Sequence, residues 1–178
     1  MERLKRSAII LSLVESLLEE NSWCGETHIQ KTTYFLQELL KVPLGFEFIL
    51  YKHGPFSFDL GDELMAMRAD MMVQLQSRPP YGPSIVPGPT SEHLKRLFPK
   101  TLKKYEKEVK FITKEMAKYN IADLERIATA LYVTLEAQET GRKEISQVVL
   151  YITEIKPHIS SEQARIALEQ EAEIRDKA

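Results

Sequence analysis

Histidine, cysteine and carboxylate side chains are the groups in this sequence that could do chemistry at a site. The histidines are spread along the chain, and no two of them lie three to five residues apart. Zinc sites usually draw ligands from such a local spacing. The four histidines are His28, His53, His93 and His158. The sequence therefore contains no metal motif, and we expect neither a metal nor another cofactor.

Covalent and acid-base catalysis are no better supported. Cys24 follows Trp23 and has no basic neighbour, so we expect a buried or half-buried bystander and not a nucleophile. Acidic pairs such as Asp62-Glu63 occupy adjacent positions, which diverge around a helix and do not converge on one substrate. The chain has no glycine-rich phosphate loop and no nucleophile elbow. We therefore predict a noncatalytic protein.

Composition bounds the class of protein. With 178 residues, 43% hydrophobic and 28% charged, the chain is typical of one globular domain or one domain with a helical extension. A single cysteine excludes an internal disulfide and fits a reducing compartment. The apolar run over residues 8–13 is interrupted by Ser12 and is too short to span a bilayer. We expect a cytoplasmic protein with no membrane contact.

Positive charge gathers in one segment, although the net charge of the chain is −2. Between His93 and Lys118 nine basic residues face three acidic ones, a local charge of +6. Two interpretations stay open: the solvated face of an amphipathic helix, or a contact with nucleic acid or an acidic protein. The candidate nucleic-acid contacts are Lys100, Lys103, Lys104, Lys107 and Lys110.

The first half of the chain has the pattern of three helices. Apolar residues at spacings of three and four predict these helices over residues 4–20, 27–40 and 58–70. Thr27 with Gln30 has the spacing of a capping box that would open the second helix. Ser57 is a natural N-cap for the third. In this helix Leu60, Leu64 and Met67 should face inward.

Strand signals lie between and after these helices. Alternating apolar residues predict a short strand over residues 46–51, which the Gly54-Pro55 turn ends. Residues 71–76 and 84–87 predict a β-hairpin with a loop at 78–83. Three helices followed by a hairpin indicate a winged-helix-like part over residues 1–88. Its strand between the second and third helices makes it a variant of the commonest topology.

The rest of the chain, residues 89–178, is predicted to be a helical part packed on the first, so that the fold is mostly α with a small β component. A seam of apolar residues from Leu102 to Tyr119 predicts a long helix. Further helices should end at Gly141 and at Lys156-Pro157, and a capping box at Ser160 and Gln163 should open a last one through about Glu171. We expect the seam to pack within the chain, which favours a monomer over a dimer.

Helix three would enter the major groove in a DNA-binding winged helix. Four carboxylates that we expect to be exposed there would be repelled by phosphates, which argues against groove reading. They are Asp59, Asp62, Glu63 and Asp70. Arg78 and Tyr81 at the hairpin tip remain candidates for a minor contact.

Two short motifs resemble those of a known family. Gln30-Lys31-Thr32-Thr33-Tyr34-Phe35-Leu36 is similar to a Q-K-L-x-Y helix, and Tyr51-Lys52-His53-Gly54-Pro55-Phe56-Ser57 is similar to a Y-K-Y-G-P-[YF]-S turn. Late echoes are Leu124-Glu125-Arg126-Ile127-Ala128 and Ile155-Lys156-Pro157-His158. These motifs resemble the SocA-like and YwgA-like proteins, also called the Panacea domain. Thr32 and His53 depart from the family pattern.

The resemblance implies a mostly helical bacterial or phage protein that is antitoxin-like or acts as a proteolytic adaptor, with a toxin or a protease as its protein partner. The predicted partner site lies where the second helix meets the Gly-Pro turn. Its residues are Lys31, Tyr34, Tyr51, Lys52 and His53. The alternative for Tyr34 and Tyr51 is that they are core aromatics. The rival function is a DNA-binding transcriptional regulator that uses the lysine-rich helix.

Overall fold

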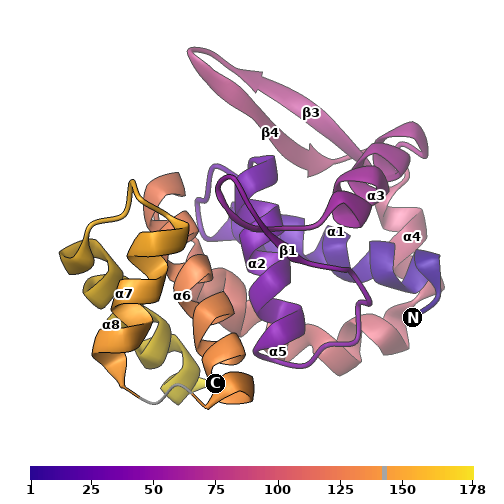
Figure 1. Ribbon diagram of the computed structural model, residues 1–178. Coiled ribbons are helices and arrows are strands. Elements are labelled where there is room, and N and C mark those ends of the chain that lie inside the picture. The colour runs from indigo at the N-terminus through magenta and orange to yellow at the C-terminus, as the bar shows by residue number, and fades with distance from the viewer. Residues whose placement is uncertain (142–143) are drawn as a thin grey trace. The chain divides into compact units, whose positions relative to one another are not determined.

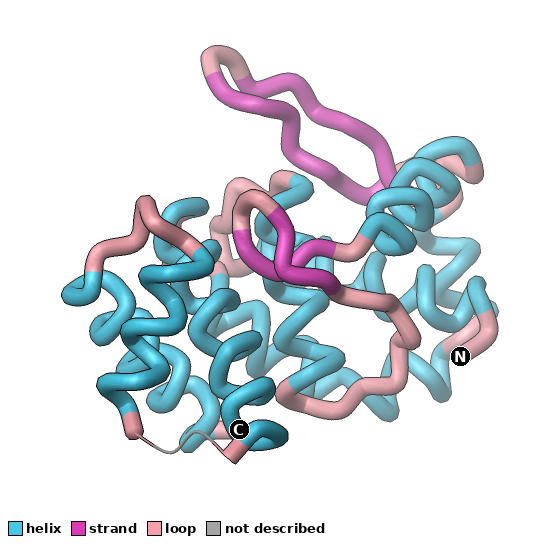
Figure 2. Tube along the Cα trace, viewed as in Figure 1, coloured by secondary structure: helices cyan, strands magenta, loops and turns pink. Residues whose placement is uncertain are grey.

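The computed structural model describes residues 1–141 and 144–178 of the chain. The described part is mostly helical, with two antiparallel two-stranded sheets (Figure 1, Figure 2). The predicted fold class, mostly α with a small β component, is confirmed. The chain forms two compact units, one of residues 1–48 and 57–118 and one of residues 49–56 and 119–178. The division therefore differs from the predicted boundary at residue 88.

Helix α1 (Arg3–Glu19) is the core of the first unit. It is buried around most of its circumference, as expected of a helix whose apolar residues are not confined to one stripe. Helix α4 (Ser91–Leu97) and helix α5 (Pro99–Met116) pack against it. The segment after residue 88 thus joins the first unit because the predicted seam on α5 is buried there: Val109, Ile112 and Met116 are at most 3% exposed.

Helix α2 (Glu26–Glu38) begins differently from the prediction. Its N-cap is Gly25, and no side chain caps it, so the capping box at Thr27 is wrong. The Gln30 amide is used elsewhere: its nitrogen donates to the Ser57 carbonyl at 2.9 Å, and its oxygen accepts from the Ser57 backbone N–H at 3.0 Å. Gln30 therefore holds the entry of the next helix and not its own N-terminus.

Helix α3 (Phe58–Ala69) begins as predicted, since the Ser57 hydroxyl accepts from the Leu60 N–H at 3.2 Å. Its inward face is also as predicted, with Leu60, Leu64 and Met67 buried. Of its carboxylates, Asp59 and Asp62 are exposed. Asp70 is exposed as well, and it accepts from Arg3 at 2.8 Å. Glu63 corrects the prediction that all four carboxylates are exposed, because it is buried.

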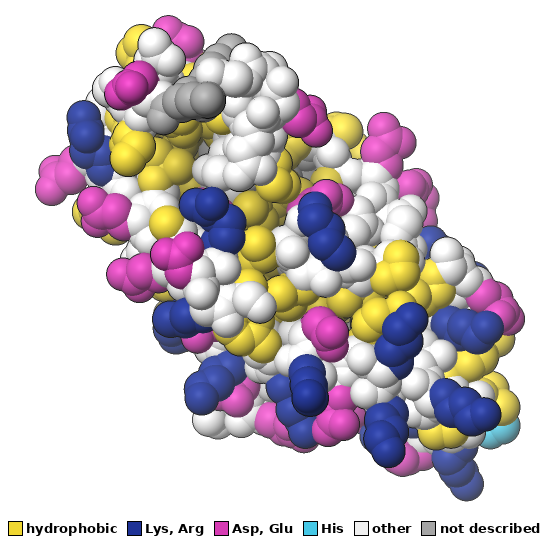
Figure 3. Space-filling model, turned by 90° about the horizontal axis from the view of Figure 1, so that it is seen from below, with side chains coloured by type: hydrophobic (Ala, Val, Ile, Leu, Met, Phe, Trp, Pro, Cys, Tyr) yellow, Lys and Arg dark blue, Asp and Glu magenta, His cyan; other side chains and the backbone are white. Residues whose placement is uncertain are grey.

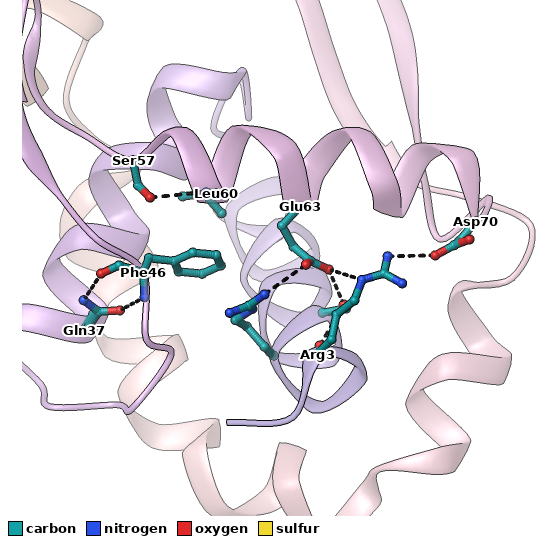
Figure 4. Close-up of polar contacts among 9 residues, drawn as sticks. Arg3, Gln37, Phe46, Ser57, Leu60, Glu63 and Asp70 are labelled. Carbon is teal, nitrogen blue, oxygen red and sulfur yellow. Dashed lines mark hydrogen bonds and ion pairs between the residues drawn. The ribbon is translucent and has the colours of Figure 1, made fainter.

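Glu63 is a buried junction between α3 and α1. Its carboxylate accepts from the Ser7 hydroxyl at 2.6 Å and lies 3.2 Å from Arg6 Nη2 and 3.3 Å from Arg3 Nε. Figure 4 shows Glu63 and Asp70 approaching Arg3 from one helix. The Arg6 guanidinium also lies 4.6 Å above the Phe46 ring, a cation–π contact. The carboxylate thus ties the two helices together with matched charge.

Strands β3 (Val73–Arg78) and β4 (Tyr81–Pro87) form the predicted hairpin, which stands out from the helices of this unit (Figure 1). Strand β3 begins and ends two residues later than predicted, β4 begins three residues earlier than predicted, and the turn is only Pro79-Pro80. The loop before α2 orders the tip, because Trp23 Nε1 donates to the Gly82 carbonyl at 3.1 Å and the Trp23 ring packs edge-on against Tyr81. Arg78 lies 5.4 Å from the same ring.

The second unit consists of a short hairpin and three helices. The hairpin pairs β1 (Ile49–Tyr51) with β2 (Gly54–Phe56). The helices are α6 (Ile121–Thr140), α7 (Ile145–Ile155) and α8 (Ser161–Lys177). Their shared core is Val133, Ala137, Val148, Val149, Ile152, Ile159 and Ala164.

The helix ends of this unit follow the sequence closely. Gly141 ends α6 in a left-handed conformation with φ 76°, and the capping box of Ser160 with Gln163 opens α8. Helix α8 continues to Lys177, past the predicted end near Glu171, because Ile174 is still buried. Strand β1 is shorter than predicted, since both backbone groups of Phe46 bond the Gln37 side chain instead of another strand.

No helix of the described residues has the length and apolarity to cross a membrane.

Candidate interaction site

The five residues predicted to form the partner site fall in different surroundings. Lys31 and Tyr34 lie on α2 in the first unit, and each is 2% exposed. The Tyr34 ring packs edge-on against Phe48, 5.0 Å between ring centres, which is core packing. Tyr51, Lys52 and His53 lie on the hairpin of the second unit and are exposed. Only these three offer side-chain surface, so the site is built from the hairpin.

The hairpin reverses over two residues, Lys52 and His53, with Tyr51 opposite Gly54. Gly54 has φ +81°, a conformation that residues with a Cβ adopt at a cost. Tyr51 is 50% exposed, and its ring lies 5.9 Å from that of Phe56. A tyrosine, a lysine and a histidine therefore stand side by side on a tight turn.

Lys156, directly after the last residue of α7, binds the backbone of the β1–β2 hairpin. Its ammonium donates to the carbonyl oxygens of Tyr51 and of Lys52, the latter at 2.8 Å, while the residue itself is only 6% exposed. Burial lowers the pKa of Lys156, and the negative charge of Glu125 acts in the opposite direction. The two carbonyls and this carboxylate are what keep the buried amine satisfied.

Glu125 on α6 lies between two histidines that are far apart in the chain. One of its oxygens is 2.8 Å from His158 Nε2, and the other is 3.3 Å from His53 Nδ1. The Glu125 side chain is 11% exposed, against 67% for His53 and 57% for His158. Although the three form a cluster, no group of His, Cys, Asp or Glu among the described residues could hold a metal ion.

The hairpin also comes very close to α6. A Cβ built on Gly54 would lie 3.0 Å from Thr129 Oγ1 and 3.2 Å from the Glu125 carbonyl oxygen. At such distances a methyl group fits only if its neighbours on α6 move by a few tenths of an ångström. Glycine at this position thus serves both the turn and the packing.

Replacing Gly54 with alanine is expected to destabilise the protein by about 2 kcal/mol, because the new Cβ is strained at positive φ and crowds α6. Urea unfolding followed by circular dichroism measures the change. Gly82→Ala is the matched control, since a Cβ there meets nothing within 4 Å and the change should stay within about 0.5 kcal/mol. Equal stabilities of the two variants would contradict the close approach.

Sequence reasoning did not assign Lys156, Glu125 and His158 to this site. Their segments belong to the late motifs of the resemblance, but no local pattern in the sequence connects them to the hairpin. The connection is made by folding, across 105 residues for Lys156 and Tyr51. A search of the sequence for histidines at short spacing therefore does not find His53 and His158, which both contact Glu125.

The groups of this cluster can donate and accept hydrogen bonds. Its groups are two imidazoles, a carboxylate and an amine, with no thiol or hydroxyl nucleophile bonded to them in the described part of the chain. The one cysteine belongs to the first unit, where burial raises the pKa of the Cys24 thiol to about 12. A thiol that stays protonated is a poor nucleophile.

The basic segment of the first unit forms an exposed face of α5. Lys100, Lys103, Lys107 and Lys114 are exposed and have no ion pair within the described residues. Lys110, by contrast, is 2.6 Å from Glu106, and Lys104 lies over the Tyr105 ring. Figure 3 shows Lys and Arg side chains interspersed with Asp and Glu on the face that it draws. The spacing of three and four residues places the unpaired lysines along one side of the helix.

Comparison with known proteins finds no family model that matches this chain and no curated protein that matches it.

Proposed function

We propose that this chain is a noncatalytic protein-interaction module that binds its partner through Tyr51, Lys52 and His53. The observation that carries the proposal is that the turn is anchored twice. Lys156 donates hydrogen bonds to the carbonyls of the turn, and Glu125 contacts the His53 ring. The backbone is held while the three side chains stay exposed. The antitoxin-like or adaptor-like role, with a toxin or a protease as partner, rests on the resemblance of the sequence motifs.

Anchoring supports binding because it lowers the entropy that a loop loses when a partner orders it. The exposed residues are of suitable kinds: tyrosine brings a large surface with few rotatable bonds, and lysine and histidine bring donors. A rigid turn with an aromatic side chain is therefore a better contact surface than its small area suggests. We propose that the protein acts as a monomer, because the α5 seam is already used within the first unit.

The proposal predicts that Tyr51→Ala with Lys52→Glu lowers capture of the partner at least tenfold while leaving the fold intact. The measurement is a pull-down from the native host with tagged wild-type and variant chains, with mass spectrometry to identify and quantify what is retained. Tyr81→Ala is the matched control, since Tyr81 is 72% exposed on the other hairpin. A partner retained equally by the double variant and the control would refute the proposed surface.

A second candidate function, DNA binding by a transcriptional regulator, has its own observation in the unpaired lysines of α5. If about four phosphates are neutralised there, affinity for duplex DNA should fall roughly a hundredfold between about 50 and 200 mM salt. Fluorescence anisotropy with a labelled duplex measures the slope, and Lys103→Glu with Lys107→Glu should abolish binding. Absence of duplex binding at low salt removes this function.

A further inference from the structure

A cavity of about 430 Å³ lies among the three helices of the second unit. This is within the size range of small-molecule sites, which are mostly apolar with a few placed polar groups. Apolar side chains from all three helices line it, among them Ala137 of α6, Val148 of α7 and Leu168 of α8. The cavity is thus shaped by the same helices that form the core of the unit.

A buried carboxylate is part of the cavity wall. Glu171 is 1% exposed, accepts from Arg175 Nε at 3.0 Å and accepts a further hydrogen bond from Thr134. Burial raises the pKa of Glu171, while the charge of Arg175 opposes the change. An ionised carboxylate can accept about four hydrogen bonds, so two contacts leave acceptor capacity for a cationic group.

Two guanidinium groups belong to the same wall. Arg175 reaches Glu171 through Nε, and its terminal nitrogens carry further donors. Arg165 of α8 also lines the cavity and has no ion pair among the described residues; Glu169, four residues further along α8, lines it too. Guanidinium donors are geometrically matched to a carboxylate. Acceptors for an ammonium and donors for a carboxylate therefore meet beside apolar walls.

We propose that this cavity binds a free α-amino acid with an apolar side chain, its ammonium at Glu171 and its carboxylate at Arg165 and Arg175. A fatty acid would satisfy the guanidinium groups and leave Glu171 beside another negative charge. A simple amine would be satisfied by the carboxylates but would leave Arg165 without an anionic partner. Only a zwitterion matches both signs, and the apolar walls select an aliphatic or aromatic side chain.

Isothermal titration calorimetry of the full chain with L-leucine tests the site. Two analogues dissect the headgroup: 4-methylpentanoate lacks the ammonium, and 3-methylbutylamine lacks the carboxylate. Each removes charge-assisted hydrogen bonds that contribute about 1.5 kcal/mol or more, so each should bind at least tenfold more weakly than leucine. Leucine should also raise the melting temperature of the protein, because it binds the folded state alone.

Arg165→Ala locates the site. Arg165 is exposed on α8, so the variant should fold normally and bind leucine about tenfold more weakly. Lys114→Ala, which removes an exposed and unpaired cation in the first unit, should leave leucine binding unchanged. Three results would overturn the proposal: no leucine binding at about 10 mM, an analogue that binds as tightly as leucine, or leucine binding that Arg165→Ala does not weaken.

Discussion

Replacing Lys156 with methionine is expected to lower the free energy of unfolding by about 3 kcal/mol, the largest effect of a single change in the second unit. Hydrogen bonds from a charged donor contribute about 1.5 kcal/mol or more each, and this ammonium makes two, to the Tyr51 and Lys52 carbonyls. Methionine keeps the unbranched apolar stem, so packing changes little. The loss therefore reports on the anchoring of the hairpin.

The control for this prediction is Lys52→Met, on the same hairpin. The Lys52 side chain is exposed, and it is its backbone carbonyl that Lys156 bonds, so the change should stay within about 0.5 kcal/mol. Urea unfolding by circular dichroism measures both variants, and hydrogen exchange at residues 49–56 shows whether the hairpin opens first. A Lys156→Met protein as stable as Lys52→Met would show that the two hydrogen bonds do not hold the turn.

The pH dependence of stability gives an independent check. Burial lowers the pKa of Lys156 in the folded protein, so the unfolded chain binds this proton more tightly. Stability of the wild type should then rise with pH from the folded pKa up to the ordinary lysine value of about 10.4. Lys156→Met lacks this contribution, so the amount by which the wild type exceeds the variant in stability should grow with pH within that window and stay constant below it.

Local patterns in the sequence predicted most of the helical structure, because helix starts and stops are encoded by neighbouring residues. Ser57, Ser160 and Gly141 each act within three or four positions of themselves, and all three have the predicted role. The predicted capping box at Thr27 is wrong because residue spacing alone does not determine which backbone groups a side chain bonds. A glutamine at the right spacing can use its amide on a distant backbone, as Gln30 does on Ser57.

The longer β3–β4 hairpin illustrates a tertiary effect on a turn. Pro79, Pro80, Gly82 and Pro83 indicate a loop by composition. Trp23, more than fifty residues earlier, donates to the Gly82 carbonyl and packs on Tyr81, so the segment continues as strand almost to its tip. No property of the hairpin sequence by itself contains this contact.

The sequence predicts the exposed residues of the candidate site but not the residues that support them. The turn residues Tyr51, Lys52 and His53 were predicted from a motif that is continuous along the chain. Their supports were not, since Glu125 and Lys156 act across 72 and 105 residues. Without an alignment, long-range charge pairs have no spacing that distinguishes them from ordinary surface residues.

Replacing Glu63 with alanine is expected to destabilise the first unit by about 3 kcal/mol. The carboxylate is 5% exposed and is the shared partner of Ser7, Arg3 and Arg6. Removing one member of a buried charge cluster leaves the others without compensation, although the arginines, 44% and 22% exposed, recover part of their hydration. Fluorescence of the single tryptophan, Trp23, follows unfolding of this unit.

Two further variants separate charge from packing at this position. Asp59→Ala, on the exposed face of the same helix, should change stability by no more than about 0.5 kcal/mol. Glu63→Gln keeps the shape and an acceptor for Ser7 but removes the charge that faces both arginines, so it should lose roughly half of what alanine loses. If glutamine is as stable as the wild type, the junction of α1 and α3 is held by shape and the Ser7 hydrogen bond, and the arginines are solvated neighbours. If glutamine is as damaging as alanine, the ion pairs carry the whole effect.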